Sequence, residues 1–151
     1  MKYLLTAALL FCTMFIARAQ VSAGVPVSAA TAAPWKASEL MEPGQLNEYI
    51  KINQAPVIFN TGTVEDIKGA IHIGSINEAA NLEKFKLALA SRPKNTEVVI
   101  YCGCCPFGKC PNIRPAYTML KDMGYSNVKV LNLYVNLRTN WTTAGYPLAE
   151  N

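Results

Sequence analysis

The sequence predicts an α/β domain with a mainly parallel sheet and helices on both faces. Short apolar runs rich in β-branched residues, at positions 57–59, 98–101 and 128–131, predict buried strands. Segments whose apolar residues recur at helical spacing lie between these runs. Strands that alternate with helices normally form a parallel sheet covered by those helices. We therefore expect a single α/β domain.

The N-terminus is typical of an export signal. Lys2 supplies the positive charge, residues 4–16 form an almost unbroken apolar run, and residues 17–19 form a small-x-small cleavage motif. The apolar run is shorter than the roughly 20 residues that span a bilayer. We therefore expect residues 1–19 to be a signal peptide that is cleaved near Ala19. The mature protein would then be periplasmic or secreted, without a stable membrane anchor.

The segment at residues 20–34 is rich in Ala, Ser, Val and Pro and carries no charge, which indicates a flexible leader ahead of a domain at residues 35–151. The formal net charge of the whole chain is only +4, without a charged block. Such a balance argues against nucleic acid as a partner.

Five elements are expected ahead of residue 98, in an order that fits alternating helices and strands. The only histidine, His72, falls in the second of the two strands and is expected to be structural. In chain order the elements are a helical turn near residues 38–40, a helix from about residue 46 to residue 53, strands at 57–59 and 67–74, and a helix from about residue 82 that stops before Pro93.

The central strand at residues 98–101 leads into a cysteine-rich loop and then a helix at about residues 113–123. Asn112 is a suitable N-cap residue, and Pro115 falls in the first turn, where its missing N–H costs nothing. Gly124 is the expected stop signal. The last strand follows at residues 128–131.

Cys102 is the candidate nucleophile because it ends the central strand. Loops between a strand and a helix hold much of the chemistry of α/β proteins. The amides and dipole at the start of the following helix favour an anion, either a thiolate or an oxyanion substrate. We therefore expect a lowered pKa for the Cys102 thiol.

Four short segments carry a family resemblance. They are Pro56-Val57-Ile58-Phe59-Asn60, Ile67-Lys68-Gly69-Ala70-Ile71, Val99-Ile100-Tyr101-Cys102, and Trp141 with Gly145-Tyr146-Pro147. In this order, and over roughly residues 35–148, they make the chain resemble the rhodanese-like domain family. The resemblance implies the rhodanese-like three-layer fold, with a mainly parallel central sheet.

The resemblance also implies sulfur transfer without a cofactor. The thiolate of Cys102 would take the outer sulfur of a small anionic donor such as thiosulfate, and the resulting persulfide would pass that sulfur to a thiol or cyanide-like acceptor. Amides of the loop could stabilise the thiolate and the donor. The expected substrate-binding residues are Gly103, Cys104, Cys105, Phe107, Gly108 and Lys109.

The chain departs from the family pattern at both loops of the expected site. The loop after Cys102 is several residues longer than in the family, and Lys109 is our candidate for its usual basic residue. Residues 60–62 replace the family's Asp-x-Arg, and Glu65-Asp66 replace its Gly-His. Donor recognition is therefore not carried over from the family.

Four cysteines within residues 102–110 leave three interpretations open. In an oxidising compartment Cys105 and Cys110 could form a structural disulfide. The same two thiols could instead resolve an oxidised or persulfidated Cys102, with a thiol-redox protein as partner.

The third interpretation is a soft-metal module for zinc or copper(I), formed by Cys102, Cys104, Cys105 and Cys110. A phosphatase or arsenate reductase is disfavoured, because such loops end in Arg and this loop has none before Arg114.

Overall fold

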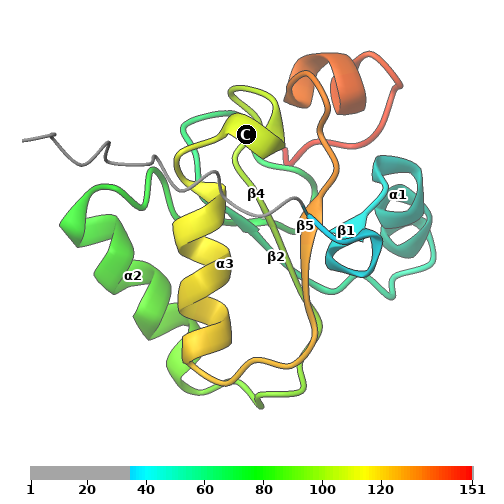
Figure 1. Cartoon of the computed structure of the whole chain (residues 1–151). Helices are drawn as coiled ribbons and strands as arrows, with labels where there is room; N and C mark the ends of the chain where they lie inside the picture. Colours follow the sequence, from blue (N-terminus) through cyan, green and yellow to red (C-terminus); the bar gives the residue numbers. More distant parts are fainter. Residues whose placement is uncertain (1–34, 151) are drawn as a thin grey trace, which may run out of the picture. The chain divides into compact units, whose positions relative to one another are not determined.

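The computed structural model describes residues 35–150 (Figure 1). The predicted signal peptide at residues 1–19 and the predicted leader at residues 20–34 lie outside the described residues. In the part of the chain that is described, no helix combines the length and the apolar character needed to cross a membrane.

Five parallel strands form one sheet, which confirms the predicted α/β class. The strand order is β1-β5-β4-β2-β3, so β4 lies in the middle. Asn60 of β2 lies opposite Tyr101 of β4, and both strands therefore end at the same edge of the sheet. The strands are β1 (Leu40–Met41), β2 (Val57–Asn60), β3 (Ile71–His72), β4 (Val98–Tyr101) and β5 (Val128–Leu131).

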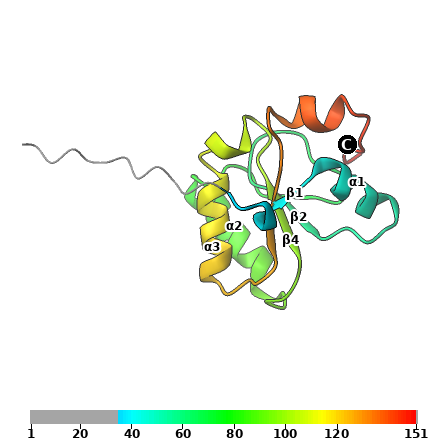
Figure 2. The ribbon, with the colours of Figure 1, turned by 45° about the vertical axis from the view of Figure 1, so that its right-hand side comes forward.

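Helices cover both faces of the sheet, and Figure 2 shows α2 and α3 on one side of the strands and α1 on the other. The α-helices are α1 (Pro43–Lys51), α2 (Ala79–Ala90) and α3 (Ile113–Asp122). Three shorter elements are η1 (Ala37–Glu39), η2 (Phe107–Lys109) and the π-helical η3 (Arg138–Thr142). Together they give the three layers that the sequence predicts.

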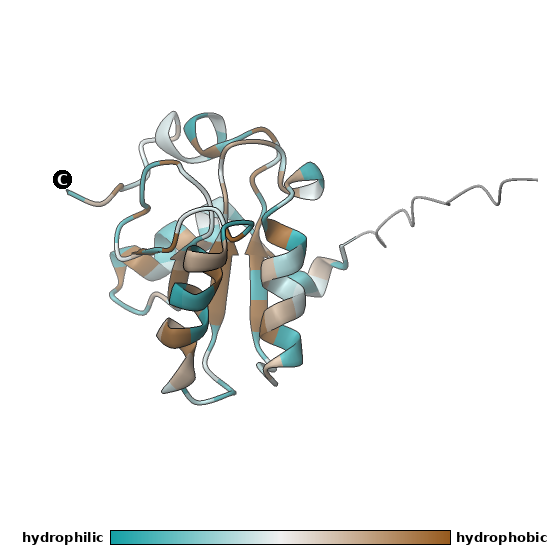
Figure 3. Ribbon diagram, turned by 90° about the vertical axis from the view of Figure 1, so that its left-hand side faces the viewer, coloured by the Kyte–Doolittle hydropathy of each residue, from teal (hydrophilic) through white to brown (hydrophobic). Residues whose placement is uncertain are grey.

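Two hydrophobic cores occupy the two faces of the sheet, because successive residues of a strand point to opposite sides. Val98 and Ile100 of β4 belong to the core under α2 and α3, whereas Val99 and Tyr101 belong to the core under α1. All four are fully buried. Cys102 continues the alternation and joins the α2–α3 core. Accordingly, the strands are the most hydrophobic elements in Figure 3.

Most elements lie where the sequence places them, and two differ. The helical turn expected near residues 38–40 is η1, but Leu40 begins edge strand β1 instead, because pairing with β5 supplies hydrogen bonds there. The strand expected at residues 67–74 shrinks to β3. Gly69 and Gly74 have φ angles of +81° and +90°, which interrupt the extended backbone. His72 ends β3 with its Nδ1 3.0 Å from a carboxylate oxygen of Asp66.

Candidate active site

Cys102 directly follows the central strand β4 and is only 2% exposed. Its backbone lies beside the end of β2, since the register pairs the preceding residue, Tyr101, with Asn60. The carboxyl edge of a parallel sheet is where α/β proteins normally bind their ligands. The rigid centre of the fold therefore fixes the position of this sulfur.

Polar groups from the following loop surround the Cys102 sulfur. The Sγ atom of Cys104 lies 3.3 Å away, and the side-chain Nδ2 of Asn112 donates a hydrogen bond at 3.4 Å. The thiol of Cys110 and the backbone N–H of Cys104 also donate to this sulfur. Its surroundings are thus arranged to hold a negative charge.

These contacts separate the pKa values of the three thiols. Hydrogen bonds from Cys110, then Asn112, then Cys104 lower the pKa of Cys102 to about 5, although burial opposes the shift. Burial and donation to Cys102 raise the pKa of Cys104 to about 12. Donation to Cys102, together with burial, also raises the pKa of Cys110. At neutral pH the cluster therefore holds its negative charge on Cys102.

The start of α3 stabilises this charge through an intermediate thiol. The sequence suggests that the amides of the helix start and of residues 103–109 point at Cys102. In the structure the backbone N–H of Cys104 does donate to Cys102, whereas the N–H groups of Asn112 and Ile113 donate to the sulfur of Cys110. The N–H groups of Phe107 and Lys109 donate to the carbonyl oxygens of Leu133 and Pro106. Cys110 thus relays the polarity of the helix start to Cys102.

Asn112 occupies the predicted N-cap position but does not cap the helix with its side chain. Its Nδ2 donates to Cys102, while its Oδ1 accepts a hydrogen bond of 3.0 Å from the hydroxyl of Ser75. Ser75 therefore fixes which end of the amide faces the sulfur. Nothing in the sequence marks this serine, because it reaches the site from the loop between β3 and α2.

Gly62, from the loop after β2, packs directly against Cys102. A Cβ atom at this position would lie 2.4 Å from the carbonyl oxygen of Cys102 and 2.6 Å from its Sγ atom. Only glycine leaves room for the sulfur here. In the sequence Gly62 belongs to an ordinary turn. The only sign of its role is that residues 60–62 differ from the family's Asp-x-Arg.

Glycine is also needed at Gly103. Its φ angle is +74°, and a Cβ atom would lie 2.9 Å from side-chain carbons of Val64 and Leu137. This residue turns the chain out of β4 and brings Cys104 back toward Cys102.

The four cysteines are free thiols, so the disulfide suggested for Cys105 and Cys110 is absent from the described residues. This disulfide does not form because Cys110 is buried against Cys102. The sulfur of Cys105 contacts that of Cys104 instead, at 3.4 Å.

The sulfur atoms of Cys102, Cys104 and Cys110 all lie within 4.8 Å of one another, whereas Cys105 is not part of this group. The four-cysteine metal set suggested by the sequence is therefore reduced to three.

The rest of the loop is less closely associated with the sulfur. Phe107 packs on Trp35 and Tyr134, with ring centroids 6.5 Å and 5.9 Å away. Gly108 and Lys109 are exposed in η2. Of the predicted substrate-binding residues, Gly103 and Cys104 are thus nearest to Cys102.

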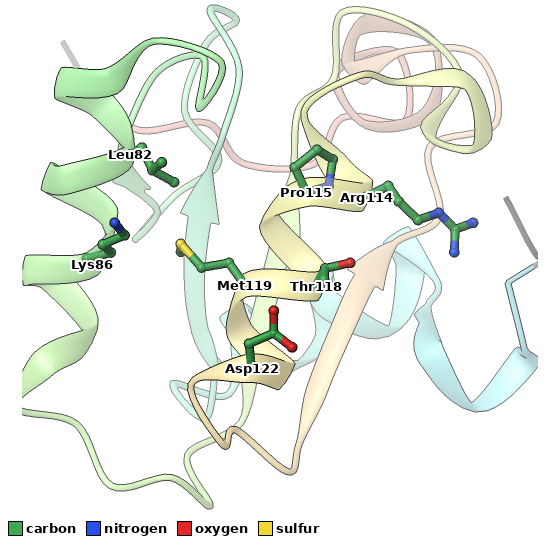
Figure 4. Close-up of a pocket in the computed structure, with 7 residues that line it drawn as sticks. All are labelled: Leu82, Lys86, Arg114, Pro115, Thr118, Met119 and Asp122. Carbon is green, nitrogen blue, oxygen red and sulfur yellow. The ribbon is translucent and has the colours of Figure 1, made fainter. Parts of the chain in front are cut away.

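A pocket of about 480 Å³ lies between α2 and α3, away from this chemistry. Arg114 points away from α2 in Figure 4, with its guanidinium 3.9 Å from the centre of the Trp35 ring. The pocket contains no cysteine, and its lining residues are Leu82, Lys86, Arg114, Pro115, Thr118, Met119 and Asp122.

Comparison with known proteins gives one result that bears on the site. The family model described as "Rhodanese-like domain" matches residues 47–133. This stretch contains strands β2 to β5 and the whole loop from Cys102 to α3. No curated protein matches the chain.

Proposed function

The chain belongs to the rhodanese-like domain family, and from this premise we propose that it is a sulfurtransferase that carries sulfur as a persulfide on Cys102. One observation supports the proposal above all others. A buried sulfur at the end of the central strand receives hydrogen bonds that lower its pKa to about 5. A thiolate is the attacking form of a cysteine, and here it exists at neutral pH without an added base.

In the first step the Cys102 thiolate attacks the outer sulfur of a donor such as thiosulfate. A sulfur–sulfur bond forms at Cys102, the sulfur–sulfur bond of the donor breaks, and sulfite leaves with the electron pair. Cys104 is exposed and lies beside the buried Cys102 sulfur, so an approaching donor meets Cys104 first. The start of α3 and Lys109 favour the approach of an anion.

In the second step a thiol or cyanide-like acceptor attacks the outer sulfur of the persulfide. The bond to Cys102 breaks, and its thiolate returns as the leaving group. A thiol with a low pKa leaves faster, so the donors from Cys110 and Asn112 assist this step as well as the first. The cycle needs no cofactor. We propose that it operates after export.

Mass spectrometry tests the assignment directly. Reduced protein incubated with thiosulfate should gain one sulfur, which peptide mapping should place on Cys102, and cyanide should then release it as thiocyanate. Cys102→Ser should abolish both results while circular dichroism shows an intact fold, and Cys105→Ser should still load Cys102. Sulfur that maps to another cysteine, or full turnover by Cys102→Ser, would contradict the proposal.

A second candidate function is thiol–disulfide exchange, favoured by the 3.3 Å between the sulfurs of Cys102 and Cys104. Cys102 would attack one sulfur of a partner's disulfide and release the other as a thiolate, and Cys104 would then attack the Cys102 sulfur and release the partner sulfur bonded to it. The partner would leave reduced, with a Cys102–Cys104 disulfide left behind. The sequence suggested Cys105 or Cys110 as resolving thiols, and the contact distance favours Cys104.

The two functions differ in their need for Cys104. Cys104→Ser should trap a mixed disulfide with a partner if exchange is the function. Sulfur loading from thiosulfate does not require this thiol and should persist in the same variant.

A further inference from the structure

A single nucleophile does not require three clustered thiols, and the arrangement of Cys102, Cys104 and Cys110 suits a bound metal ion. The sulfur atoms of Cys102, Cys104 and Cys110 lie within 4.8 Å of one another. Metal–sulfur bonds of about 2.3 Å would place three sulfurs around one ion roughly 4 Å apart. The three side chains therefore need only small movements to share an ion.

The ligand set favours a soft ion that accepts three ligands. Thiolates select copper(I) and zinc among the common biological metals. A structural zinc site normally has four protein ligands. Within residues 35–150 no histidine or carboxylate joins this group of three. Copper(I) is satisfied by two or three thiolates, so the set matches copper(I) better.

Hydrogen-bond donors surround the sulfurs of Cys102 and Cys110 and favour negative charge there. The backbone N–H groups of Asn112 and Ile113 donate to the sulfur of Cys110. The Asn112 amide donates to Cys102, and Ser75 holds that amide in place. Such outer hydrogen bonds orient metal ligands, and the start of a helix favours the net negative charge of a copper(I) thiolate complex. Cys102 and Cys110 are buried, while Cys104 is exposed, which offers a path for the ion.

We propose that Cys102, Cys104 and Cys110 form a three-thiolate site for copper(I). On binding, each sulfur donates an electron pair to the ion, protons still held by the thiols pass to solvent, and no atom changes oxidation state. Because the site uses the sulfur of Cys102, bound copper(I) blocks the loading of that sulfur. This last consequence rests on the proposed sulfur transfer, whereas the site itself does not.

The test is an anaerobic titration of the reduced full chain with copper(I), in competition with a chromophoric copper(I) chelator. Native mass spectrometry should show one copper per chain. Cys104→Ser and Cys110→Ser should each weaken binding by about a hundredfold or more, because each removes a ligand. Cys105→Ser is the matched control and should bind as the parent does, since its sulfur lies outside the cluster.

Cys104 is exposed, so its serine variant should fold even if the Cys110 variant does not. Unchanged copper affinity in Cys104→Ser, loss of binding in Cys105→Ser, or zinc bound as tightly as copper(I) in direct competition would each overturn the site. Sulfur loading of the metal-free protein is measured separately. A chain that binds copper but loads no sulfur from any donor therefore refutes the sulfurtransferase alone.

Discussion

Strands β2 and β4 are neighbours that end at the same edge of the sheet, yet the segments that follow them differ. After β2 the polar side chain of Asn60 forms hydrogen bonds with the residues that directly follow it. The side-chain Nδ2 of Asn60 donates to the carbonyl oxygen of Val64 at 2.7 Å and to Asp66 at 2.9 Å, and its Oδ1 accepts from the N–H of Gly62 at 3.0 Å. After β4 the polar groups converge on the sulfur of Cys102 instead.

This difference gives the two segments different roles: the β2 turn supports the site, and the loop after β4 carries its chemistry. Hydrogen bonds within the β2 turn, and those from Thr61 to the carbonyl oxygen of Tyr101, hold this turn in place, and its Gly62 leaves room for the sulfur. In the loop after β4 the hydrogen-bond donors surround the anionic sulfur of Cys102, and a substrate can take the place of these donors. Changes in the β4 loop should therefore alter the chemistry, whereas changes in the β2 turn should alter stability, except at Gly62, which touches Cys102.

Gly62→Ala should have the largest effect, because this is where the β2 turn touches Cys102. The added Cβ would lie 2.6 Å from the sulfur, so the thiolate must shift. Displacement of a nucleophile by about 1 Å lowers a rate by roughly a hundredfold. Sulfur loading from thiosulfate measures the effect. Gly44→Ala in α1 is the control, since its Cβ meets only an ordinary contact at 3.4 Å. Equal rates for both variants would refute the steric argument.

Cys110→Ala should raise the pKa of Cys102, because it removes the donor that lowers this pKa most. The thiolate is lost as the pH falls through the pKa, so loading by the parent should be half-maximal near pH 5. In the variant the midpoint should move up by about one unit or more. The pH dependence of the loading rate reports this shift. Cys105→Ala should keep the parent midpoint, and a shift as large there would contradict the relay through Cys110.

Ser75→Ala should act in the same direction more weakly. It leaves Asn112 in place and removes only the hydrogen bond that orients its amide. A hydrogen bond worth about 1 kcal/mol corresponds to roughly a fivefold lower rate where the thiolate fraction is limiting. Ser75→Thr, which keeps the hydroxyl, should restore the parent pH profile. Failure of threonine to restore it would mean that Ser75 acts through packing.

Asn60→Ala should have the smallest effect on chemistry and a clear effect on stability. It removes the hydrogen bonds that close the β2 turn and leaves the carbonyl of Val64 without this donor. Such losses lower the free energy of unfolding by about 1–3 kcal/mol. Urea unfolding measures the loss. The pKa of Cys102 should stay near 5, and a shift as large as that of Cys110→Ala would erase the distinction between the two segments.

Sequence reasoning worked where local patterns decide the structure. The apolar run before Cys102 predicts a buried strand, and Pro115 and Gly124 mark the start and end of the following helix; the structure has β4 and α3 there. Edge strand β1 escaped prediction because two residues carry no period and depend on pairing with β5.

The interior of the site was less accessible to prediction. Which thiols face Cys102 depends on the path of a loop that reverses at Gly103, and no spacing rule gives that path. Gly62 packs against the sulfur from 40 positions away in the chain, and Ser75 acts on it through Asn112, which lies 37 positions from Ser75.

Both steps of the proposed sulfur transfer require that the cluster makes Cys102 a thiolate at neutral pH. Alkylation of the reduced protein by iodoacetamide, followed cysteine by cysteine by peptide mass spectrometry from pH 4 to about pH 10, tests this requirement most directly. We predict that the modification rate of Cys102 is half-maximal near pH 5 and constant above it. A rate that continues to rise through pH 9, the ordinary pKa of a thiol, would show that Cys102 is not a thiolate at neutral pH.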